Sequence, residues 1–433
     1  MKALVIGSGG REHAILSALR RTSRDPLDLY CAPGNGGISD LAQCVPIRVT
    51  DKTGLVDFAR NNEIDLTIVG PEGPLAVGIV DEFESAGLRI MGPSRAAARL
   101  EGSKGFAKDF MTRHGIPTAK YQLAATETEA LDALRSGRFG GIDAAVVVKA
   151  DGLAAGKGVV VAPSRLEGEK AVKELLSGSL VSSSATQQLL VEEALNGREV
   201  SVLAFADGRN YVLMPAARDH KRIGERDTGP NTGGMGAITN PSVVNPETLQ
   251  KIRSEIVEPT LKGASQEGFP FKGILFVGLM LTADGPKVLE YNVRFGDPET
   301  QAILLRLQSN LFQIFQAITD GELGNLEVNW SNQSSACVVL ASGGYPGPCE
   351  SGLPITGLGS TGDEVEIFHA GTTKSEDGSF LTAGGRVLGV AAADATLPEA
   401  LGRCYAAISK ISWPGMQYRR DIGAFREGAA AGP

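Results

Sequence analysis

Three polar residues near position 290 have the types and the spacing needed for phosphate chemistry. In the segment KVLEYNVRFGDPETQ, side chains alternate between the faces of a predicted strand, so Glu290, Asn292 and Arg294 share one face. Carboxylate and amide oxygens suit Mg²⁺, which completes its shell with water and phosphate oxygens. A guanidinium beside them can neutralise a carboxylate or a transferring phosphoryl group. A solvated sheet face would show the same alternation, but the GDPET turn and a glycine-rich segment earlier in the chain favour a metal and phosphate site.

That glycine-rich segment, VVVKADGLAAGKGVVVA, places glycines and two lysines between two β-branched runs. A phosphate-binding P-loop needs four residues between its glycines, then Lys and Ser or Thr at the start of a helix. Here three residues separate Gly152 from Gly156, and Gly158 follows Lys157 before a strand resumes. The pattern predicts a β-hairpin that folds over phosphates as a lid, with Lys149 projecting from its first strand.

A glycine turn also follows the first predicted strand. The sequence GSGGRE is similar to a dinucleotide-binding fingerprint, but Glu12 stands where close helix–strand packing would require Gly or Ala. The second strand ends in Cys31, Ala32 and Pro33 rather than in an acid for the ribose hydroxyls, so NAD or FAD is not expected. Backbone amides at the helix start, with Arg11 nearby, could hold a phosphate or a sugar. A purely structural turn is the alternative.

The segment RDHKRIGERDTGPNTGGMGA, from Arg218 to Ala237, is predicted to be a long polar loop. Such loops are uncommon in compact domains unless they are functional. Its charges and glycine amides suit an anionic substrate assembly. His220 is its only histidine, and both a structural hydrogen-bonding role and a general-base role fit it. The other histidines are expected to be structural or exposed: His13 (close to the first glycine turn), His114 and His369.

The composition limits the class of protein. The chain has 433 residues, 42% hydrophobic and 21% charged, which suggests roughly two to four globular domains. There is no apolar run of the roughly 18 residues that a membrane helix needs, and the N-terminus lacks a signal-peptide pattern. Five scattered cysteines without a CxxC pair fit reduced thiols. We therefore expect a cytoplasmic protein, and the net charge of −8 argues against nucleic acid as its main partner.

Short apolar runs and helical patterns alternate in a way that predicts the fold class. The first 103 residues show βαβ alternation, which indicates an open parallel α/β sheet. Its predicted strands are 2–7, 28–32, 65–70 and 88–92, and its predicted helices are 13–21, 53–62 and 76–87. The remaining predicted parts are an α+β domain at 104–329 with a small β-rich subdomain at about 120–194, a small α+β domain at 330–427, and a frayed tail at 428–433.

Taken together, the motifs resemble those of the glycinamide ribonucleotide synthetases, also called phosphoribosylamine–glycine ligases, of the ATP-grasp superfamily. The resemblance runs nearly end to end and in order. It rests on the segments GSGGREHA, LTIVGPEGPL, LEGSKGFAKDF, KADGLAAGKGV, DHKR, TGPNTGGMGA, RFGDPETQ, SGGYPG and TAGGRVL. RFGDPETQ and GPNTGGMGA are the most specific of these.

The resemblance implies that residues 104–329 are an ATP-grasp domain and that its β-rich subdomain is a lid. It implies that the chain joins phosphoribosylamine to glycine in purine biosynthesis, with cleavage of ATP to ADP and phosphate. In such ligases the glycine carboxylate takes the γ-phosphoryl group, and the amine then displaces phosphate from the glycyl phosphate. The expected cofactors are ATP and Mg²⁺ or Mn²⁺. A monomer that acts on small molecules is expected, with neither nucleic acid nor a membrane as partner.

The resemblance also implies site residues. The metal ligands are Glu290 and Asn292, and the catalytic residues are Arg294 (toward the glycine carboxylate or the phosphoryl group), Lys221 and Asp219. The ATP-binding residues are Lys108, Lys149, Gly152, Gly156, Lys157, Gly158, Glu192, Glu193, Ala194, Leu195 and Glu199, with the adenine at 193–195 and the ribose at Glu199. The residues for phosphoribosylamine and glycine are Gly9, Gly10, Arg11, Asn35, Glu72, Asn231, Gly234 and Asp297.

One departure and two alternatives remain at this point. Many ATP-grasp enzymes carry another metal-binding acid on the strand before the Glu-x-Asn pair, but the run FKGILFVGLMLT contains none, so two side-chain ligands are expected. Another ATP-grasp ligase, such as a carboxylase subunit or a peptide-bond-forming ligase, would share the lid and this strand but not GPNTGGMGA followed by RFGDPET. A non-enzymatic nucleotide-binding protein is disfavoured because it need not retain Lys149, Glu290, Asn292 and Arg294 together.

Overall fold

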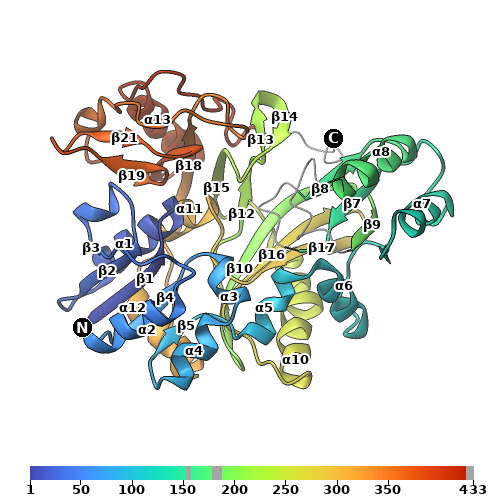
Figure 1. Cartoon of the computed structure of the whole chain (residues 1–433), viewed down its shortest axis with the longest axis horizontal. Coiled ribbons are helices and arrows are strands. Elements are labelled where there is room, and N and C mark those ends of the chain that lie inside the picture. Colours follow the sequence, from blue (N-terminus) through green and yellow to red (C-terminus); the bar gives the residue numbers. More distant parts are fainter. Residues whose placement is uncertain (153–157, 178–187, 426–433) are drawn as a thin grey trace.

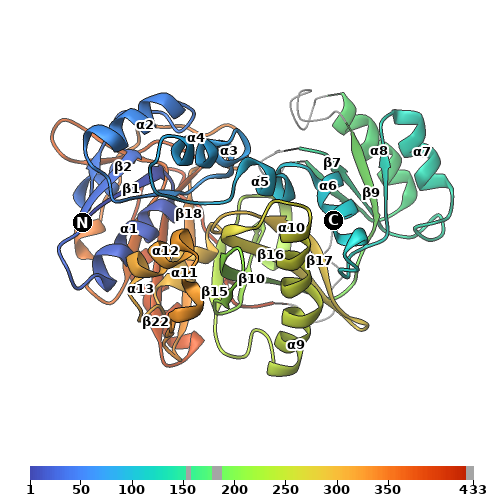
Figure 2. The same ribbon diagram turned by 90° about the horizontal axis from the view of Figure 1, so that it is seen from below.

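The computed structural model describes residues 1–152, 158–177 and 188–425. A large antiparallel sheet runs through the molecule, with the N-terminal and C-terminal parts toward one end and a small antiparallel sheet at the other (Figure 1). Seen from below, the small sheet projects away from the body of the molecule (Figure 2). Within the described ranges, no helix is long and apolar enough to cross a membrane.

The N-terminal part is a five-stranded parallel sheet in the order β3-β2-β1-β4-β5, which confirms the predicted open α/β fold. The predicted helix at 76–87 is wrong in its first residues: Gly78 adopts a left-handed φ of 81°, so one helix ends at Ala76 and the next begins at Ile79. The strands are β1 (Lys2–Gly7), β2 (Asp28–Pro33), β3 (Gln43–Cys44), β4 (Leu66–Val69) and β5 (Ile90–Met91). The helices are α1 (Gly10–Thr22), α2 (Lys52–Asn61), α3 (Glu72–Ala76), α4 (Ile79–Ser85) and α5 (Arg95–Gly102).

The first glycine turn is closed by a side chain of its own helix. A carboxylate oxygen of Glu12 accepts the backbone N–H of Gly9 at 2.6 Å, and the other oxygen contacts Arg11 at 2.7 Å. A Cβ at Gly7 would lie 2.5 Å from this carboxylate group, and a Cβ at Gly70 would lie 2.1 Å from it. The glycines therefore make room for Glu12, and the helix start is capped from within rather than left open for a pyrophosphate.

The small sheet is antiparallel, in the order β6-β9-β7-β8, and two helices pack on it. It contains β6 (Tyr121–Ala124), β7 (Val146–Ala150), β8 (Val159–Ala162) and β9 (Leu189–Glu193), with α7 (Glu127–Arg135) and α8 (Arg165–Leu176). Helix α6 (Lys104–Arg113) precedes it. These strands are built from β-branched runs such as VVV, which favour the pleated, half-buried surface of a sheet.

The large sheet runs in the order β17-β16-β10-β12-β15-β18-β22-β19, with β11 paired to β10. Its strands are β10 (Arg198–Asp207), β11 (Tyr211–Leu213), β12 (Ala217–Asp219), β15 (Gly236–Thr239), β16 (Lys272–Thr282), β17 (Gly285–Asn292), β18 (Ser334–Ala341), β19 (Glu366–His369) and β22 (Arg386–Asp394). The helices of this region are α9 (Pro246–Lys251), α10 (Glu258–Gln266), α11 (Glu299–Leu304), α12 (Leu311–Asp320) and α13 (Leu397–Ile408), with a π-helical turn (Ile252–Val257) between α9 and α10.

The C-terminal strands extend this sheet because β15 pairs with β18 in antiparallel register. The predicted boundary near residue 330 therefore falls within one continuous sheet, and the predicted division into domains stays a prediction. The predicted tail at 428–433 lies outside the described residues.

The prediction of one long loop from Arg218 to Ala237 is wrong. Its two ends are sheet strands, β12 and β15, and its middle forms a hairpin of β13 (Arg222–Gly224) and β14 (Thr228–Asn231). These strands are only three or four residues long, so an alternation of apolar residues, by which strands are recognised, does not develop. A second small hairpin, β20 (Thr372–Lys374) and β21 (Phe380–Thr382), belongs to the C-terminal part.

An aromatic cluster anchors the segment that follows β17. The ring of Phe295 lies 6.3 Å from that of Phe205 on β10 and 6.2 Å from that of Phe315 on α12. All three side chains are buried. Their packing against the sheet holds the residues on either side of Phe295, including those predicted to be functional, in a fixed position.

The Glu12 cap leads to a stability prediction. Gly70→Ala should lower the free energy of unfolding by about 1–3 kcal/mol, because the added methyl meets a carboxylate that is pinned by two hydrogen bonds. The control is Gly73→Ala, since a Cβ there meets nothing within 4 Å. Denaturant unfolding of both variants is the measurement. Equal stability of the two would contradict the proposed packing.

Candidate active site

The candidate metal ligands lie on one face of the large sheet. Glu290 and Asn292 are two residues apart on β17, paired with Gly278 and Phe276 of β16. A Cβ at Gly278 would lie 3.2 Å from the Cγ of Glu290. The strand before the Glu-x-Asn pair therefore places a residue without a side chain, not another acid, beside Glu290.

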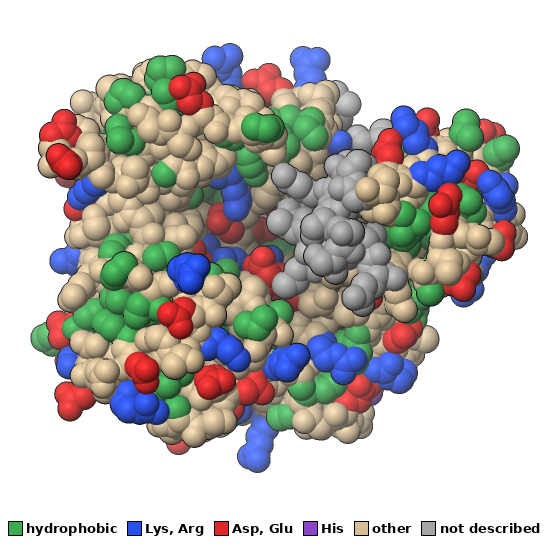
Figure 3. Space-filling view, in the orientation of Figure 1, with side chains coloured by type: hydrophobic (Ala, Val, Ile, Leu, Met, Phe, Trp, Pro, Cys, Tyr) green, Lys and Arg blue, Asp and Glu red, His purple; other side chains and the backbone are tan. Residues whose placement is uncertain are grey.

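Three lysines surround Glu290. Burial raises the pKa of Glu290, but the positive charges of Lys221, Lys149 and Lys104 outweigh burial and hold that pKa below its ordinary value. An ionised carboxylate next to the amide oxygen of Asn292 suits Mg²⁺ or Mn²⁺. Among the described residues, no group of three or more His, Cys, Asp or Glu side chains could hold a metal ion. Phosphate oxygens and water would therefore have to complete the shell. The hollow at the centre of the molecule shows acidic and basic side chains together (Figure 3).

Two of the predicted ATP-binding lysines share one carboxylate. Glu192 of β9 forms ion pairs with Lys108 at 3.3 Å and with Lys149 at 3.1 Å. Lys108 also donates to the hydroxyl of Thr118, and Lys149 to the carbonyl of Leu289 on β17. Burial lowers the pKa of Lys108 to about 8, against the pull of Glu192. The structure thus brings these three predicted residues together beside the strand that bears the candidate metal ligands.

Helix α6 holds the base of the glycine-rich segment. Its N-terminal Ser103 hydroxyl and the backbone N–H of Gly105 donate to the two carboxylate oxygens of Asp151, at 3.1 and 3.2 Å. The ammonium group of Lys104 donates to the carbonyl of Gly152 at 2.8 Å. Burial lowers the pKa of Lys104, while Glu290 opposes this shift. Lys104 therefore links the start of the glycine-rich segment to Glu290, a candidate metal ligand.

A second charged group lies on the neighbouring strands. The ammonium group of Lys221, after β12, contacts the carboxylate of Glu199 on β10. Burial opposes its charge, yet Glu199, Asp219 and Glu290 raise the pKa of Lys221 well above its ordinary value. Burial raises the pKa of Asp219, against the pull of Lys221. Lys221 is thus a firmly charged cation facing Glu290.

Arg294 is surrounded by protein acceptors. Its Nη2 contacts Glu101 at 2.9 Å and donates to the Oδ1 of Asn292 at 3.1 Å, and its Nε contacts Glu72 at 3.3 Å. Its Nη1 donates to the carbonyl of Phe295 at 3.1 Å. Burial disfavours the charge, but Glu101 and Glu72 raise the pKa of Arg294 above its ordinary value. The guanidinium is charged, and its direction is set by these contacts.

A pocket of about 380 Å³ opens where the N-terminal and C-terminal parts meet. Ser8 and Gly9 line it from the first glycine turn, and Gly34 and Asn35 from the turn after β2. Asp297 lines it from the segment after β17. The C-terminal part contributes the remaining wall, with Tyr345, Ala370, Gly371, Thr372, Ala383, Gly385 and Arg386. Hydroxyls, backbone groups and one ion pair make this wall polar, which suits a small hydrophilic ligand.

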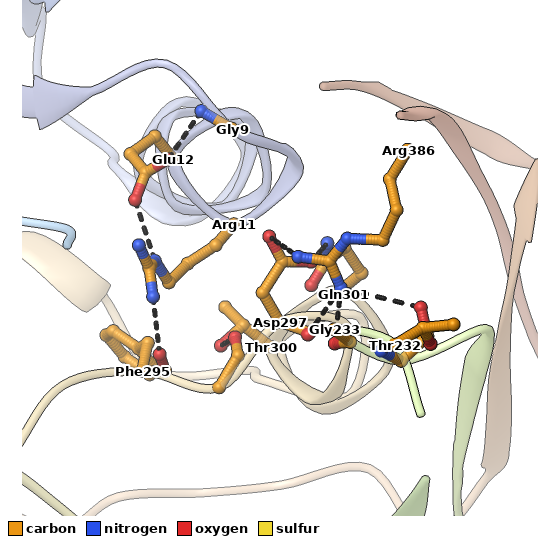
Figure 4. Close-up of polar contacts among 12 residues, drawn as sticks. Gly9, Arg11, Glu12, Thr232, Gly233, Phe295, Asp297, Thr300, Gln301 and Arg386 are labelled. Atoms are coloured by element: carbon orange, nitrogen blue, oxygen red, sulfur yellow. Dashed lines mark hydrogen bonds and ion pairs between the residues drawn. The ribbon is translucent and has the colours of Figure 1, made fainter. Parts of the chain in front are cut away.

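Arg386 of β22 ties three chain segments together at the pocket (Figure 4). It forms an ion pair with Asp297 at 3.1 Å and donates to the carbonyls of Gly233 and Asp297. Asp297 also accepts a hydrogen bond from Gln301 at 2.7 Å. Burial raises the pKa of Asp297, but Arg386 and Arg11 outweigh it and hold the pKa below its ordinary value. The pocket therefore carries an ionised Asp297 next to a charged Arg386.

Comparison with known proteins identifies the family. Models of phosphoribosylglycinamide synthetase match the chain with the N domain over residues 1–101, the ATP-grasp (A) domain over 102–300 and the C domain over 335–425. The chain belongs to the phosphoribosylglycinamide synthetase family. This confirms the family predicted from the motifs.

Individual relatives agree with this assignment. The chain is 46% identical over 424 residues to phosphoribosylamine–glycine ligase of Caldanaerobacter subterraneus subsp. tengcongensis, a match that covers 98% of this chain and 100% of that protein. A crystal structure of phosphoribosylamine–glycine ligase from Thermotoga maritima is 34% identical, with a TM-score of 0.84 over 97% of this chain and 100% of that one. A biotin carboxylase from Campylobacter jejuni has a TM-score of 0.70 over 96% of this chain and 92% of that one, but is 15% identical. The carboxylase alternative thus shares the fold alone, and the predicted fold class and ligase class are confirmed.

Several substrate residues predicted for this synthetase have structural partners of their own. The amide nitrogen of Asn35 donates to the carbonyls of Ser8 and His369, and its oxygen accepts the N–H groups of Gly37 and Ile38. Asn35 therefore joins two walls of the pocket with all of its hydrogen-bonding capacity. Its role toward substrate stays a prediction.

The other predicted residues lie in four different places in the structure. Gly9 and Asp297 line the pocket, whereas Arg11 reaches the carbonyl of Phe295 at 3.0 Å (Figure 4). Predicted residues away from the pocket lining are Gly10 (against Gln301), Glu72 (on Arg294), Gly234 (against Pro298) and Asn231 (on β14). Glu193, the last residue of β9, forms hydrogen bonds with the backbone of Lys120. Ala194 and Leu195 lie in the link to β10. Gly152 and Gly158 flank residues 153–157, so Gly156 and Lys157 lie outside the described residues.

Several residues at the synthetase site were not predicted, among them Lys104, Glu101, Tyr345 and Arg386. Lys104 and Glu101 lie in the motif LEGSKGFAKDF, where a sequence signal existed but pointed to Lys108. Tyr345 and Arg386 lie in the C-terminal motifs SGGYPG and TAGGRVL, far along the chain from the other site residues. Arg386 begins β22 and Tyr345 follows β18, and the pairing of these two strands brings both residues to the pocket.

The histidines of this synthetase have structural roles. His220 is buried, its ring stacks on Phe425 at 4.2 Å, and its Nε2 accepts the N–H of Gly423. Burial lowers the pKa of His220. The general-base alternative is therefore not supported. His13 and His369 stack at 5.6 Å between the N-terminal and C-terminal parts, and Nδ1 of His13 accepts the N–H of His369.

This histidine pair predicts a pH dependence of stability. Burial lowers the pKa of His13 to about 3 and that of His369 to about 4, from an ordinary 6.5. At a pH below 6.5 but above the folded-state pKa values, the unfolded chain binds protons that the folded chain does not. The free energy of unfolding therefore falls as the pH drops below 6.5. His13→Asn keeps an acceptor for His369, and should reduce this slope by up to about 1.4 kcal/mol per pH unit. Denaturant unfolding between pH 7 and 5 is the measurement, and an unchanged slope would contradict the assignment.

Proposed function

We propose that this chain joins phosphoribosylamine to glycine with cleavage of ATP, and that the reaction takes place between the metal face of β17 and the pocket of 380 Å³. One observation carries the proposal. A single segment, from Asn292 to Asp297, bears a metal ligand at its start, Arg294 in its middle and a pocket residue at its end. A phosphorylated carboxylate at Arg294 would thus lie between the nucleotide and the amine.

The nucleotide phosphates fit the lysine-rich side of the site. Lys104, Lys149 and Lys221 surround Glu290, and compact ammonium groups suit a polyphosphate. Glu290 and Asn292 are the side chains that would hold Mg²⁺ or Mn²⁺, which when bound screens the charge of the phosphate oxygens. Lys108 and Lys149 meet at Glu192, close to the predicted adenine-binding link at 193–195.

The chemical steps need positioning more than a protein nucleophile. A carboxylate oxygen of glycine attacks the γ-phosphorus, and ADP leaves. The nitrogen of phosphoribosylamine then attacks the carbonyl carbon of glycyl phosphate, phosphate leaves, and the nitrogen loses a proton. Arg294 orients the carboxylate, and Lys221, held charged by Asp219 and Glu199, stabilises the transferring phosphoryl group.

The pocket suits the ribosylamine. Its backbone groups and the hydroxyl of Tyr345 can hydrogen-bond a sugar phosphate, and ionised Asp297 can receive an amine. The first glycine turn is capped by Glu12, so the wall formed with the C-terminal part is the larger contribution. The monomeric state and the cytoplasmic location stay predictions.

ADP release with Mg-ATP tests the function, with glycine and freshly generated phosphoribosylamine omitted in turn. We expect ADP only when both are present, with one ADP formed per glycinamide ribonucleotide. ADP formed with other carboxylates, or without the amine, would contradict the substrate assignment while leaving ATP-grasp chemistry in place.

The metal assignment has its own test. Glu290→Ala should lower the ligation rate at least about 100-fold without unfolding the chain, because an ionised ligand is lost beside the phosphates. The matched control is Glu247→Ala, which removes a largely exposed carboxylate on α9. Turnover and circular dichroism of both variants are the measurements. Turnover of Glu290→Ala near that of the wild type would reject the assignment.

A further inference from the structure

Glu101 is a buried carboxylate that the reaction above does not use. It lies on α5, in the N-terminal part, with 9% of its surface exposed. One of its oxygens contacts Nη2 of Arg294 at 2.9 Å, and the other accepts the backbone N–H of Val293 at 2.8 Å. A single side chain thus holds two consecutive residues directly after Asn292.

The burial of this charge is costly unless it is well paired. Burial raises the pKa of Glu101, Arg294 lowers it and Glu72 raises it again. In many proteins, a buried ion pair such as that of Glu101 with Arg294 stabilises the fold less than apolar side chains of similar volume would. Its contacts are concentrated on the segment after β17, which points to a role in the geometry of that segment.

The contacts of Arg294 show what this geometry is. Glu72 and Glu101, the two carboxylates that form ion pairs with its guanidinium, both come from the N-terminal part of the chain. The same Nη2 that contacts Glu101 also donates to the Oδ1 of Asn292. A displacement of the Glu101 carboxylate would therefore move Arg294 and release the amide of Asn292.

We propose that Glu101 is a positioning residue that acts through Arg294 and the Val293 amide to hold the reacting segment in place. Both of its carboxylate oxygens are engaged by Arg294 and the Val293 N–H, so it acts through these two partners. This inference rests on the proposed function, in which Arg294 orients the glycine carboxylate. The N-terminal part thereby contributes to the phosphoryl-transfer step as well as to the pocket.

A double-mutant cycle on kcat/KM for glycine tests the proposal. Glu101→Gln has the same length, but its amide offers one acceptor and one donor to two N–H groups, so one contact becomes donor against donor. We expect a loss of roughly 10- to 100-fold in kcat/KM for glycine, the size of effect that a misplacement of about 1 Å produces. KM for phosphoribosylamine should stay within about twofold, because Asp297 and Arg386 keep their pairing. In an Arg294→Lys background, Glu101→Gln should cost clearly less than it does in the wild type, because the part of its effect that passes through Arg294 is already lost and only the Val293 contact remains.

Penalties that multiply in the double variant would overturn the proposal, since they would show that Glu101 acts independently of Arg294. Glu84→Gln, an exposed carboxylate on α4, is the matched control and should leave both constants unchanged. If Glu101→Gln does not fold, Glu101→Asp keeps the charge but shortens the arm, and enters the same cycle.

Hydrogen exchange of the peptide around residues 290–296 gives a readout independent of turnover. Glu101→Gln should speed exchange in this peptide, because the Val293 N–H loses its acceptor, and unchanged exchange would overturn the proposal. A wild-type chain that forms no glycinamide ribonucleotide would instead reject the proposed function, and the exchange result would still decide whether Glu101 holds the segment.

Discussion

Buried charges that cannot be left unpaired hold this structure together around one short segment. The segment after β17 presents Arg294 and Asp297 to an interior from which water is largely removed, and each would destabilise the fold strongly if alone. Glu72 and Glu101 pair the arginine from the N-terminal part, and Arg386 pairs the aspartate from the C-terminal part. The N-terminal part and the C-terminal strands of the large sheet must therefore both be in place before these charges are paired.

The same pairing extends to the phosphate side of the site. Lys108 and Lys149 meet Glu192, Lys221 meets Glu199, and Lys104 donates to a backbone carbonyl. The lysines are thus stable inside the protein, but their charge is partly balanced already. A nucleotide triphosphate adds more negative charge than these lysines alone can offset, which is a physical reason for a divalent cation at Glu290 and Asn292.

The sequence was informative where periodicity and local spacing carry the signal. The parallel N-terminal strands, the hairpin β7–β8 and the shared face of Glu290 and Asn292 follow from alternation alone. The strands at the two ends of 218–237 could not be recognised, because only two residues of each fall in this range and they are held by pairing with β10 and β18. Arg386 and Glu101 were missed for a related reason. Both lie in motifs on which the family resemblance rests, but the motifs do not say which side chain reaches the site until the fold brings each to its partner.

The pairing of β15 with β18 has a consequence for how such a protein can change over evolutionary time. All eight residues of β18 are buried. Without β18, the four-residue strand β15 would be an unpaired edge of the sheet, and its apolar residues would be exposed. Exposed edges of this kind recruit other chains and promote aggregation. The last hundred residues are therefore not a detachable module that recombination could exchange freely. New sequence can be added at the ends of the chain, or in exposed loops, far more readily than at the seam between its middle and its C-terminal parts.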